Sequence, residues 1–194
     1  MSLTPVDARQ IATIVTHLEM RERPRPAPMA TSALRLVRWQ EPALEKYRAL
    51  FRRVGEPWMW FSRLVMPDAR VTDIIHDPAV EIYAVCDPKG IEVGIIELDF
   101  RQMPDCELSF FGLIPELAGK GFGRWMMAQT RSLAWRKGVE RFWVHTCTLD
   151  DPRALGFYIK SGFTPFHREV EIFDDPRVSG LMPREAAAHI PILA

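Results

Sequence analysis

Three glycines within five positions give the stretch that most constrains this chain, residues 119–124 with the sequence GKGFGR. An apolar run at residues 108–115 precedes it, and a helical pattern at residues 124–137 follows it. Glycine permits tight and left-handed turns because it has no Cβ. The first N–H groups of the following helix lack partners, and the helix dipole is positive there. The stretch therefore predicts a strand, an anion-binding loop and a helix, in that order.

The composition narrows the possible partners. The 194 residues suggest one domain with room for an extra element, and 25 basic residues balance 25 acidic ones. This balance gives no general attraction for nucleic acid or an anionic membrane, and no apolar run approaches the roughly 20 residues of a membrane span. Cys86, Cys106 and Cys147 are widely spaced, without metal-ligand spacing. We expect reduced thiols, no metal, no nucleic-acid or membrane partner, and a cytoplasmic location.

Apolar periodicity predicts a mixed α/β sheet. Strands are expected at residues 33–39, 80–86, 91–101, 106–114, 141–147 and 163–173. Helices are expected at residues 41–53, 68–76, 124–137 and 151–160. In strand 91–101, Glu97, Asp99 and Arg101 should share one face, opposite Ile96 and Leu98. The strands first form an antiparallel meander, and a strand–helix–strand–helix–strand passage follows.

The two ends look like appendages. Residues 4–22 are expected to form a helix, because four apolar residues recur at helical spacing: Ile11, Ile14, Val15 and Leu18. Pro24, Pro26 and Pro28 then indicate an extended linker. The chain is thus divided into an N-terminal helix and linker at residues 1–30, a central domain at residues 31–175, and a proline-interrupted tail at residues 176–194.

Two phosphate-loop interpretations of the glycine stretch are weak. A nucleotide-hydrolase loop needs GxxxxGK followed by Ser or Thr, but Gly121 follows Lys120 here. A dinucleotide loop needs GxGxxG and an acidic residue about 20 positions further on. This chain has GxGxG, and Asp150 and Asp151 come too late. A loop for the pyrophosphate of an acyl-CoA is the third interpretation.

The loop resembles motif A of the GCN5-related N-acetyltransferase (GNAT) family, which has the form R/Q-x-x-G-x-G/A between a strand and a helix. Gly121 and Gly123 match its two small positions, whereas Ala118 stands where Arg or Gln is usual. Ala118 removes one side-chain contact, but most of the contacts in such a loop come from the main chain. We therefore expect CoA binding to survive.

A second resemblance lies downstream. Residues 151–163 resemble the family's N-x-x-A-x-x-x-Y-x-x-x-G-F segment, with Tyr158, Gly162 and Phe163 in place and Asp151 replacing the usual Asn. The ordered pair of motifs is specific, and the resemblance covers residues 33–173. It implies a mixed, mostly antiparallel central sheet of six to seven strands flanked by helices, formed by an acyl-CoA N-acyltransferase domain at residues 31–175.

The resemblance also implies an activity. It predicts direct transfer of an acetyl group from acetyl-CoA to a primary amine of a small molecule or peptide, without a metal. The family habit adds a possible homodimer. Two alternatives stay open: a catalytically idle acyl-CoA-binding or sensor module, and an acyltransferase that uses another acyl chain.

The resemblance assigns the cofactor contacts. The pyrophosphate should lie on the loop, contacting Ala118, Gly119, Lys120, Gly121, Phe122, Gly123 and Arg124. The pantetheine should pair with the backbone of Phe111 and Leu113, and Asp151 completes the set. Gly112 is expected to form a β-bulge that opens the sheet there.

The reaction needs a base for the amine and a proton for the departing thiolate. Glu107 is the preferred base, on one strand face with Ser109 and Phe111, and Glu97 is the alternative. Tyr158 is the expected acid, in the family's usual position. His145 is expected to be structural rather than catalytic. Three neighbouring aromatic residues are expected either to wall an acceptor pocket or to pack in the core: Trp58, Trp60 and Phe61.

Overall fold

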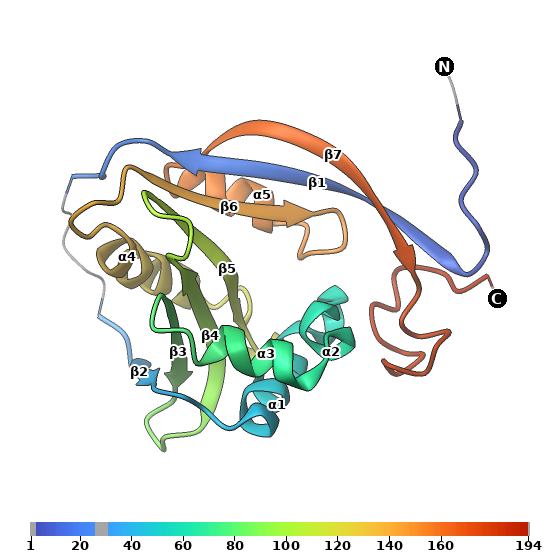
Figure 1. The fold of residues 1–194 in the computed structure, drawn as a ribbon, viewed down its shortest axis with the longest axis horizontal. Helices are drawn as coiled ribbons and strands as arrows, with labels where there is room; N and C mark the ends of the chain where they lie inside the picture. The colour runs from blue at the N-terminus through green and yellow to red at the C-terminus, as the bar shows by residue number, and fades with distance from the viewer. Residues whose placement is uncertain (1–2, 26–30, 194) are drawn as a thin grey trace.

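The protein, seen here as a computed structural model that describes residues 3–25 and 31–193, is built on one seven-stranded sheet. The strands are β1 (Gln10–Met20), β2 (Arg35–Trp39), β3 (Val80–Cys86), β4 (Glu92–Asp99), β5 (Asp105–Leu113), β6 (Arg141–Cys147) and β7 (Thr164–Asp174). Their order in the sheet is β2-β3-β4-β5-β6-β1-β7 (Figure 1). Every neighbouring pair is antiparallel except β5 and β6, which run parallel. The mixed, mostly antiparallel sheet predicted from the sequence is confirmed.

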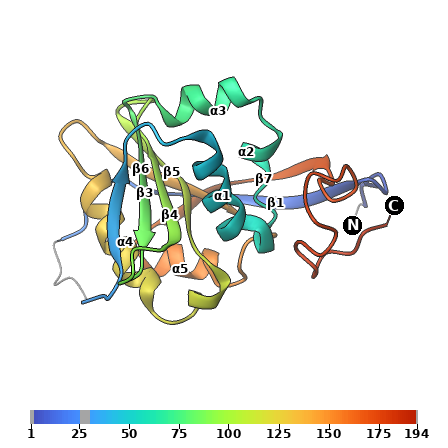
Figure 2. The same ribbon diagram turned by 90° about the horizontal axis from the view of Figure 1, so that it is seen from below.

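Helices cover both faces of the sheet. On one side lie α1 (Leu44–Gly55), the 3₁₀ turn η1 (Glu56–Trp58), α2 (Ser62–Val65) and α3 (Asp68–Ile75). On the other side lie α4 (Phe122–Ala134) and α5 (Ala154–Lys160), with the 3₁₀ turn η2 (Pro115–Leu117) before α4. Figure 2 shows the two groups on opposite sides of the strands. Apolar residues of both layers and of the sheet form one buried core.

The helix predicted at residues 4–22 is wrong, because residues 10–20 form β1. Its residues are rich in β-branched side chains, and Ile11, Thr13 and Val15 alternate with exposed neighbours. Helical spacing of four apolar residues could not distinguish this pattern from a strand. Pairing with β6 on one side and β7 on the other then stabilises the extended form. Pro26 and Pro28 of the predicted linker lie outside the described residues.

The parallel pair β5 and β6 opens like a V. Pairing holds from Asp105 with Arg141 to Glu107 with Trp143, and the described strands diverge beyond that point. A β-bulge lies where they separate, because Leu98 pairs with Leu108 but Glu97 pairs with Phe110. Ser109 is therefore the extra residue. The predicted bulge at Gly112 is wrong, since Gly112 pairs regularly with Ile95.

The bulge changes which side chains share a face. Glu107 pairs with Asp99 and Phe110 pairs with Glu97, so these four residues face the α1–α3 side. Phe111 faces α5 instead, where its ring stacks on Phe157. The prediction that Glu107 and Phe111 share a face is therefore wrong, because the extra residue shifts the alternation by one.

Packing against α1 explains Gly112. A Cβ on this residue would lie 2.6 Å from Cγ1 of Val54 and 3.1 Å from the Trp60 ring. Glycine is needed there because the helix and its following turn approach the strand closely.

The segment after β7 forms no helix or strand within residues 175–193. Arg177 holds it together, with 2% of its surface exposed. Its guanidinium binds the Asp175 carboxylate and donates to the carbonyl oxygens of Ala186, Ala187 and Ile190. This segment lies at the far end of the β1–β7 ribbon (Figure 1).

Candidate active site

A cavity of about 560 Å³ lies where β5 and β6 diverge. One end is formed by the glycine loop, α4 and the start of α5. The other end is formed by the segment from Trp58 to Ser62 together with Val15 of β1 and Glu171 and Phe173 of β7. Leu108–Leu113 of β5 and three residues of β6 line its middle: Val144, His145 and Cys147. Such a cavity can hold a long ligand between two diverging strands.

The glycine loop forms the first end. Gly119 and Gly121 have φ angles of 77° and 87°, which favour glycine, and Gly121 is the N-cap of α4. No side chain caps this helix, so its first N–H groups are left for a ligand. Five of the predicted loop residues line the cavity: Ala118, Gly119, Gly121, Gly123 and Arg124. Lys120 and Phe122 belong to the same loop but do not line the cavity.

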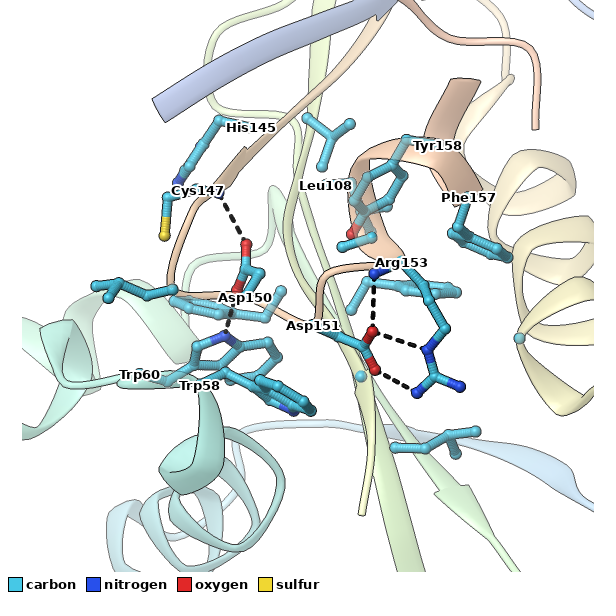
Figure 3. Close-up of a pocket in the computed structure, with 18 of the residues that line it drawn as sticks. Trp58, Trp60, Leu108, His145, Cys147, Asp150, Asp151, Arg153, Phe157 and Tyr158 are labelled. Atoms are coloured by element: carbon cyan, nitrogen blue, oxygen red, sulfur yellow. Dashed lines mark hydrogen bonds and ion pairs between the residues drawn. The ribbon is translucent and has the colours of Figure 1, made fainter. Parts of the chain in front are cut away.

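Asp151 and Arg153 flank the loop from the α5 side. Arg153 Nε donates to Oδ1 of Asp151 at 2.8 Å, and Nη2 binds Oδ2 (Figure 3). The remaining nitrogen, Nη1, lies 2.7 Å from the position that a Cβ on Gly119 would take. The Arg153 hydrogen bonds lower the pKa of Asp151, which therefore stays ionised at neutral pH.

The β5 backbone provides an open edge beside the cavity. Beyond Glu107, β5 pairs with β4, and in the described part of the chain no strand pairs with its β6 side. The predicted pantetheine contacts, Phe111 and Leu113, lie on this edge and line the cavity. An extended chain with amide groups can pair there as an added strand would.

Tyr158 reaches the cavity from α5. The side chain is 7% exposed and packs against three aromatic rings: Phe111, Phe157 and Phe163. Burial raises its pKa well above the ordinary value, and the nearby Asp150 charge adds to this. Within residues 3–25 and 31–193 its hydroxyl has no hydrogen-bond partner. The phenol is thus a protonated, unoccupied donor at the cavity wall (Figure 3).

Glu107 lies beside the cavity rather than in its wall. Burial raises its pKa to about 7, and the negative charges of Asp99 and Glu97 contribute. Nδ1 of His145, which does line the cavity, lies 3.7 Å from Oε1 of Glu107. Burial and the neighbouring His17 lower the pKa of His145. A carboxyl group that titrates near neutral pH therefore sits behind a neutral imidazole.

Glu97 is fully buried and already occupied. Its Oε2 accepts a 2.6 Å hydrogen bond from the Tyr47 hydroxyl, and its Oε1 accepts one of 2.6 Å from Nη2 of Arg63. The Arg63 charge keeps this carboxylate paired. Sequence alternation correctly put Glu97 and Asp99 on one face, but that face is covered by α1 and α2 rather than solvated.

Trp60 bridges the cavity. Its Nε1 donates to Oδ1 of Asp150 at 3.4 Å, while its ring packs against Phe51 and Phe110 (Figure 3). Trp60 therefore lines the cavity and also packs in the core, while the acceptor pocket stays a prediction. Phe61 stacks on Phe173 with ring centroids 4.5 Å apart, which joins α2 to β7.

Charge is separated along the cavity. The basic lining residues are Arg124 and Arg153, both at the loop end. Asp150 and Glu171 line the remainder and, like Glu107, have no Lys or Arg partner in the described part of the chain. Asp150 instead accepts from the Thr146 hydroxyl and the Cys147 amide. One end is thus suited to an anion and the other to a cation.

Sequence reasoning missed several of these residues. Val15 and Glu171 join the site because β1 and β7 pair across the end of the sheet, which a predicted helix at residues 4–22 concealed. Arg153 had a sequence signal, an Asp two residues earlier in a turn that precedes a helix. Its contact with Gly119 depends on tertiary structure.

The sheet thus has a V-shaped opening with a glycine loop at one end and the Tyr158 phenol in its wall. The "Acetyltransferase (GNAT) family" model matches residues 36–163, more than half of the chain. The chain belongs to the GNAT family.

Similar proteins agree with this class. The tRNA(Met) cytidine acetyltransferase TmcA 2 of Saccharolobus solfataricus is 35% identical over 69 residues, which is 36% of this chain and 9% of that protein. A GCN5-related N-acetyltransferase from Sphaerobacter thermophilus has a TM-score of 0.59 at 18% identity, over 86% of this chain and 52% of that one. This chain thus spans about half the length of that structure and a small part of the curated relative.

Two smaller enzymes share the fold. The aminoglycoside acetyltransferase meta-AAC0020 from an uncultured soil metagenomic sample has a TM-score of 0.53 at 18% identity, over 67% of this chain and 88% of that one. The spermidine N-acetyltransferase of Vibrio cholerae has a TM-score of 0.54 at 18% identity, over 76% and 97%. At these identities the likeness concerns the fold.

In the part of the chain that the structure describes, no helix is long and apolar enough to cross a membrane. No group of three or more His, Cys, Asp or Glu side chains is arranged to hold a metal ion in residues 3–25 and 31–193.

Proposed function

We propose that this protein is an acetyl-CoA-dependent N-acetyltransferase that moves the acetyl group directly from CoA to a primary amine of a small molecule. The observation that carries the proposal is the Tyr158 hydroxyl, which lies at the cavity wall and has no hydrogen-bond partner in the described part of the chain. A protonated phenol in this position is free to donate a hydrogen bond to a ligand in the cavity.

The residues present fit the co-substrate. The α4 amides at the glycine loop suit a pyrophosphate, and the open β5 edge at Phe111 and Leu113 suits the amide-containing pantetheine. Acetyl-CoA supplies the activated thioester. The loop and the strand edge hold its two parts so that the thioester lies in the V between β5 and β6.

Two side chains, Glu107 and Tyr158, then transfer protons. Glu107 accepts a proton from the ammonium group of the acceptor, directly or through a water, which leaves a nucleophilic amine. A bond forms between this nitrogen and the acetyl carbon, and the carbon–sulfur bond breaks. Tyr158 donates its proton to the departing sulfur, and the second proton of the attacking nitrogen passes to the Tyr158 phenolate, directly or through solvent, which leaves a neutral amide. Glu97 is unsuited to the first role because Tyr47 and Arg63 occupy its oxygens.

The charge of the second end favours a cationic small-molecule acceptor. Glu107, Asp150 and Glu171 have no Lys or Arg partner among the described residues, and aromatic side chains wall the same end, an arrangement that attracts ammonium groups. The aminoglycoside and spermidine acetyltransferases with this fold act on such amines, which supports the proposal. A peptide amine is the alternative acceptor. Self-association and a cytoplasmic location stay predictions from the sequence.

The test is release of free thiol from acetyl-CoA across a panel of monoamines, diamines, polyamines, aminoglycosides and peptides. Mass spectrometry should find that the mass of the acceptor has risen by about 42 Da, which is the mass that one N-acetylation adds. Tight CoA binding without release on any acceptor would favour the idle sensor module instead. Release with a longer acyl-CoA but not with acetyl-CoA would favour another acyl chain.

A further inference from the structure

Arg153 makes a contact with the glycine loop that its sequence motif does not explain. It immediately precedes α5, far along the chain from the glycine loop, yet its Nη1 lies 2.7 Å from the ideal Cβ position on Gly119. The guanidinium therefore lies directly against the loop backbone. A side chain at residue 119 would displace it.

Asp151 fixes the orientation of this guanidinium. Its carboxylate accepts from Nε and Nη2 of Arg153, and Oδ1 also accepts from the Arg153 amide at 2.9 Å. A guanidinium carries five N–H donors, and Asp151 takes two of them. Both Nη1 hydrogens and one on Nη2 are left without a partner in the described part of the chain. These three donors lie beside the anion-binding loop.

We propose that Arg153 binds a phosphate group of the acyl-CoA from the α5 side and that Asp151 positions Arg153 rather than contacting the cofactor itself. The inference rests on the proposed function. Ala118 has no side-chain donor, whereas the uncapped α4 N-terminus and the Arg153 guanidinium both lie at the glycine loop. A phosphate held between the helix N-terminus and a planar guanidinium receives charge-assisted hydrogen bonds from both.

The ion pair also explains an acidic residue beside an anion site. An isolated Asp151 carboxylate would repel a pyrophosphate, whereas the Asp151–Arg153 pair is neutral and presents its donors outward. Removal of Arg153 should therefore do two things: take away donors and expose an uncompensated negative charge. The loss of donors does not depend on Asp151, whereas the uncompensated charge is that of Asp151 itself. A second substitution at Asp151 can therefore separate the two effects.

Calorimetric titration of the whole chain with CoA, 3′-dephospho-CoA and pantetheine tests the proposal. Arg153→Gln should weaken CoA and 3′-dephospho-CoA by about tenfold or more and leave pantetheine unchanged. A loss confined to CoA would also support a phosphate contact and would place it at the 3′-phosphate. Arg70→Gln is the matched control, because Arg70 is an exposed arginine on α3, away from the cavity.

The double variant tests the role of Asp151. Arg153→Gln combined with Asp151→Asn should bind CoA more tightly than Arg153→Gln alone, because the uncompensated carboxylate is gone. If Asp151 contacted the cofactor directly, the double variant would bind more weakly, and the positioning role would be wrong. If Arg153→Gln bound all three ligands as the unmodified protein does, the phosphate contact would be wrong while CoA binding stood. Failure of the unmodified protein to bind CoA would instead overturn the proposed function.

Discussion

His145 brings its Nδ1 to 3.7 Å from Oε1 of Glu107, and the imidazole lines the cavity while the carboxylate lies behind it. The pKa values of the two groups are shifted in opposite directions: that of Glu107 is raised to about 7, and that of His145 is lowered. Near neutral pH the imidazole is uncharged. A proton taken from an acceptor can therefore be held by the carboxylate, with His145 as a neutral neighbour.

The pH dependence of turnover follows from Glu107. A base must be deprotonated to act, so kcat/KM should rise with pH and level off above about 7, the value to which burial raises the pKa of this residue. Glu107→Gln should lower kcat by about a hundredfold or more and remove this inflection, while CoA affinity is kept. Initial rates between pH 5.5 and 9 measure both. If the pH profile of Glu107→Gln kept the inflection, the inflection would belong to the titration of another group.

Glu107 should also cost the protein stability at high pH. Its pKa is raised on folding, so the folded state prefers the neutral carboxyl. The free energy of unfolding should therefore fall as pH rises from the ordinary carboxyl pKa through about 7. Glu107→Gln should raise the thermal midpoint at pH 8 and leave it nearly unchanged at pH 4.5. If Glu107→Gln changed the thermal midpoint by the same amount at pH 8 and at pH 4.5, the raised pKa of Glu107 would be contradicted.

Tyr158→Phe should separate catalysis from folding. The hydroxyl has no partner in the described part of the chain, so its removal breaks no protein hydrogen bond, and the aromatic packing on Phe111 and Phe163 remains. We expect kcat to fall by about a hundredfold, with the thermal midpoint and the Kd for CoA preserved. An unchanged kcat would remove Tyr158 from the acid role.

Glu171 should set a preference for a second positive charge on the acceptor. It lines the acidic end of the cavity and has no Lys or Arg partner in the described residues. For amines of equal length, diamines should therefore have a higher kcat/KM than monoamines. Glu171→Gln should reduce this ratio by about three- to tenfold, within the range of a partly screened charge pair, and leave monoamines unaffected.

Glu45→Gln is the control for this experiment, because Glu45 is an acidic residue in the first turn of α1 and does not line the cavity. A monoamine preference in the unmodified protein would contradict the role of Glu171. So would an equal loss for both kinds of amine in Glu171→Gln.

The sequence predicted the parts of the fold that depend on local pattern. Strands β3 and β6 begin and end where the apolar runs do, and the glycine loop precedes α4 as expected. The same reasoning gave a wrong prediction for residues 10–20, because their apolar spacing fits a helix. Their β-branched content and the edges of β6 and β7, with which they pair, favour a strand.

Motif spacing in the sequence singled out Tyr158 and the loop residues, and the structure places Tyr158 and most of the loop residues in the wall of one cavity. The position of the bulge at Ser109 could not be predicted, because it depends on how β4 and β6 pair with β5. Arg153 and Glu171 likewise acquire their roles through contacts between segments that are far apart in the chain.

The place of β1 in the sheet has a consequence for the order of folding. Val15 pairs with Cys147 and with Glu169, so β1 cannot take its place in the sheet until β6 and β7, which come much later in the chain, have been synthesised. Contacts of such long sequence separation slow folding, because a large loop must close before they form. Until then β6 and β7 have exposed edges that can pair with other chains. The acceptor end of the cavity, to which Val15 contributes, is therefore completed late, and a nascent chain that lacks β7 cannot be active.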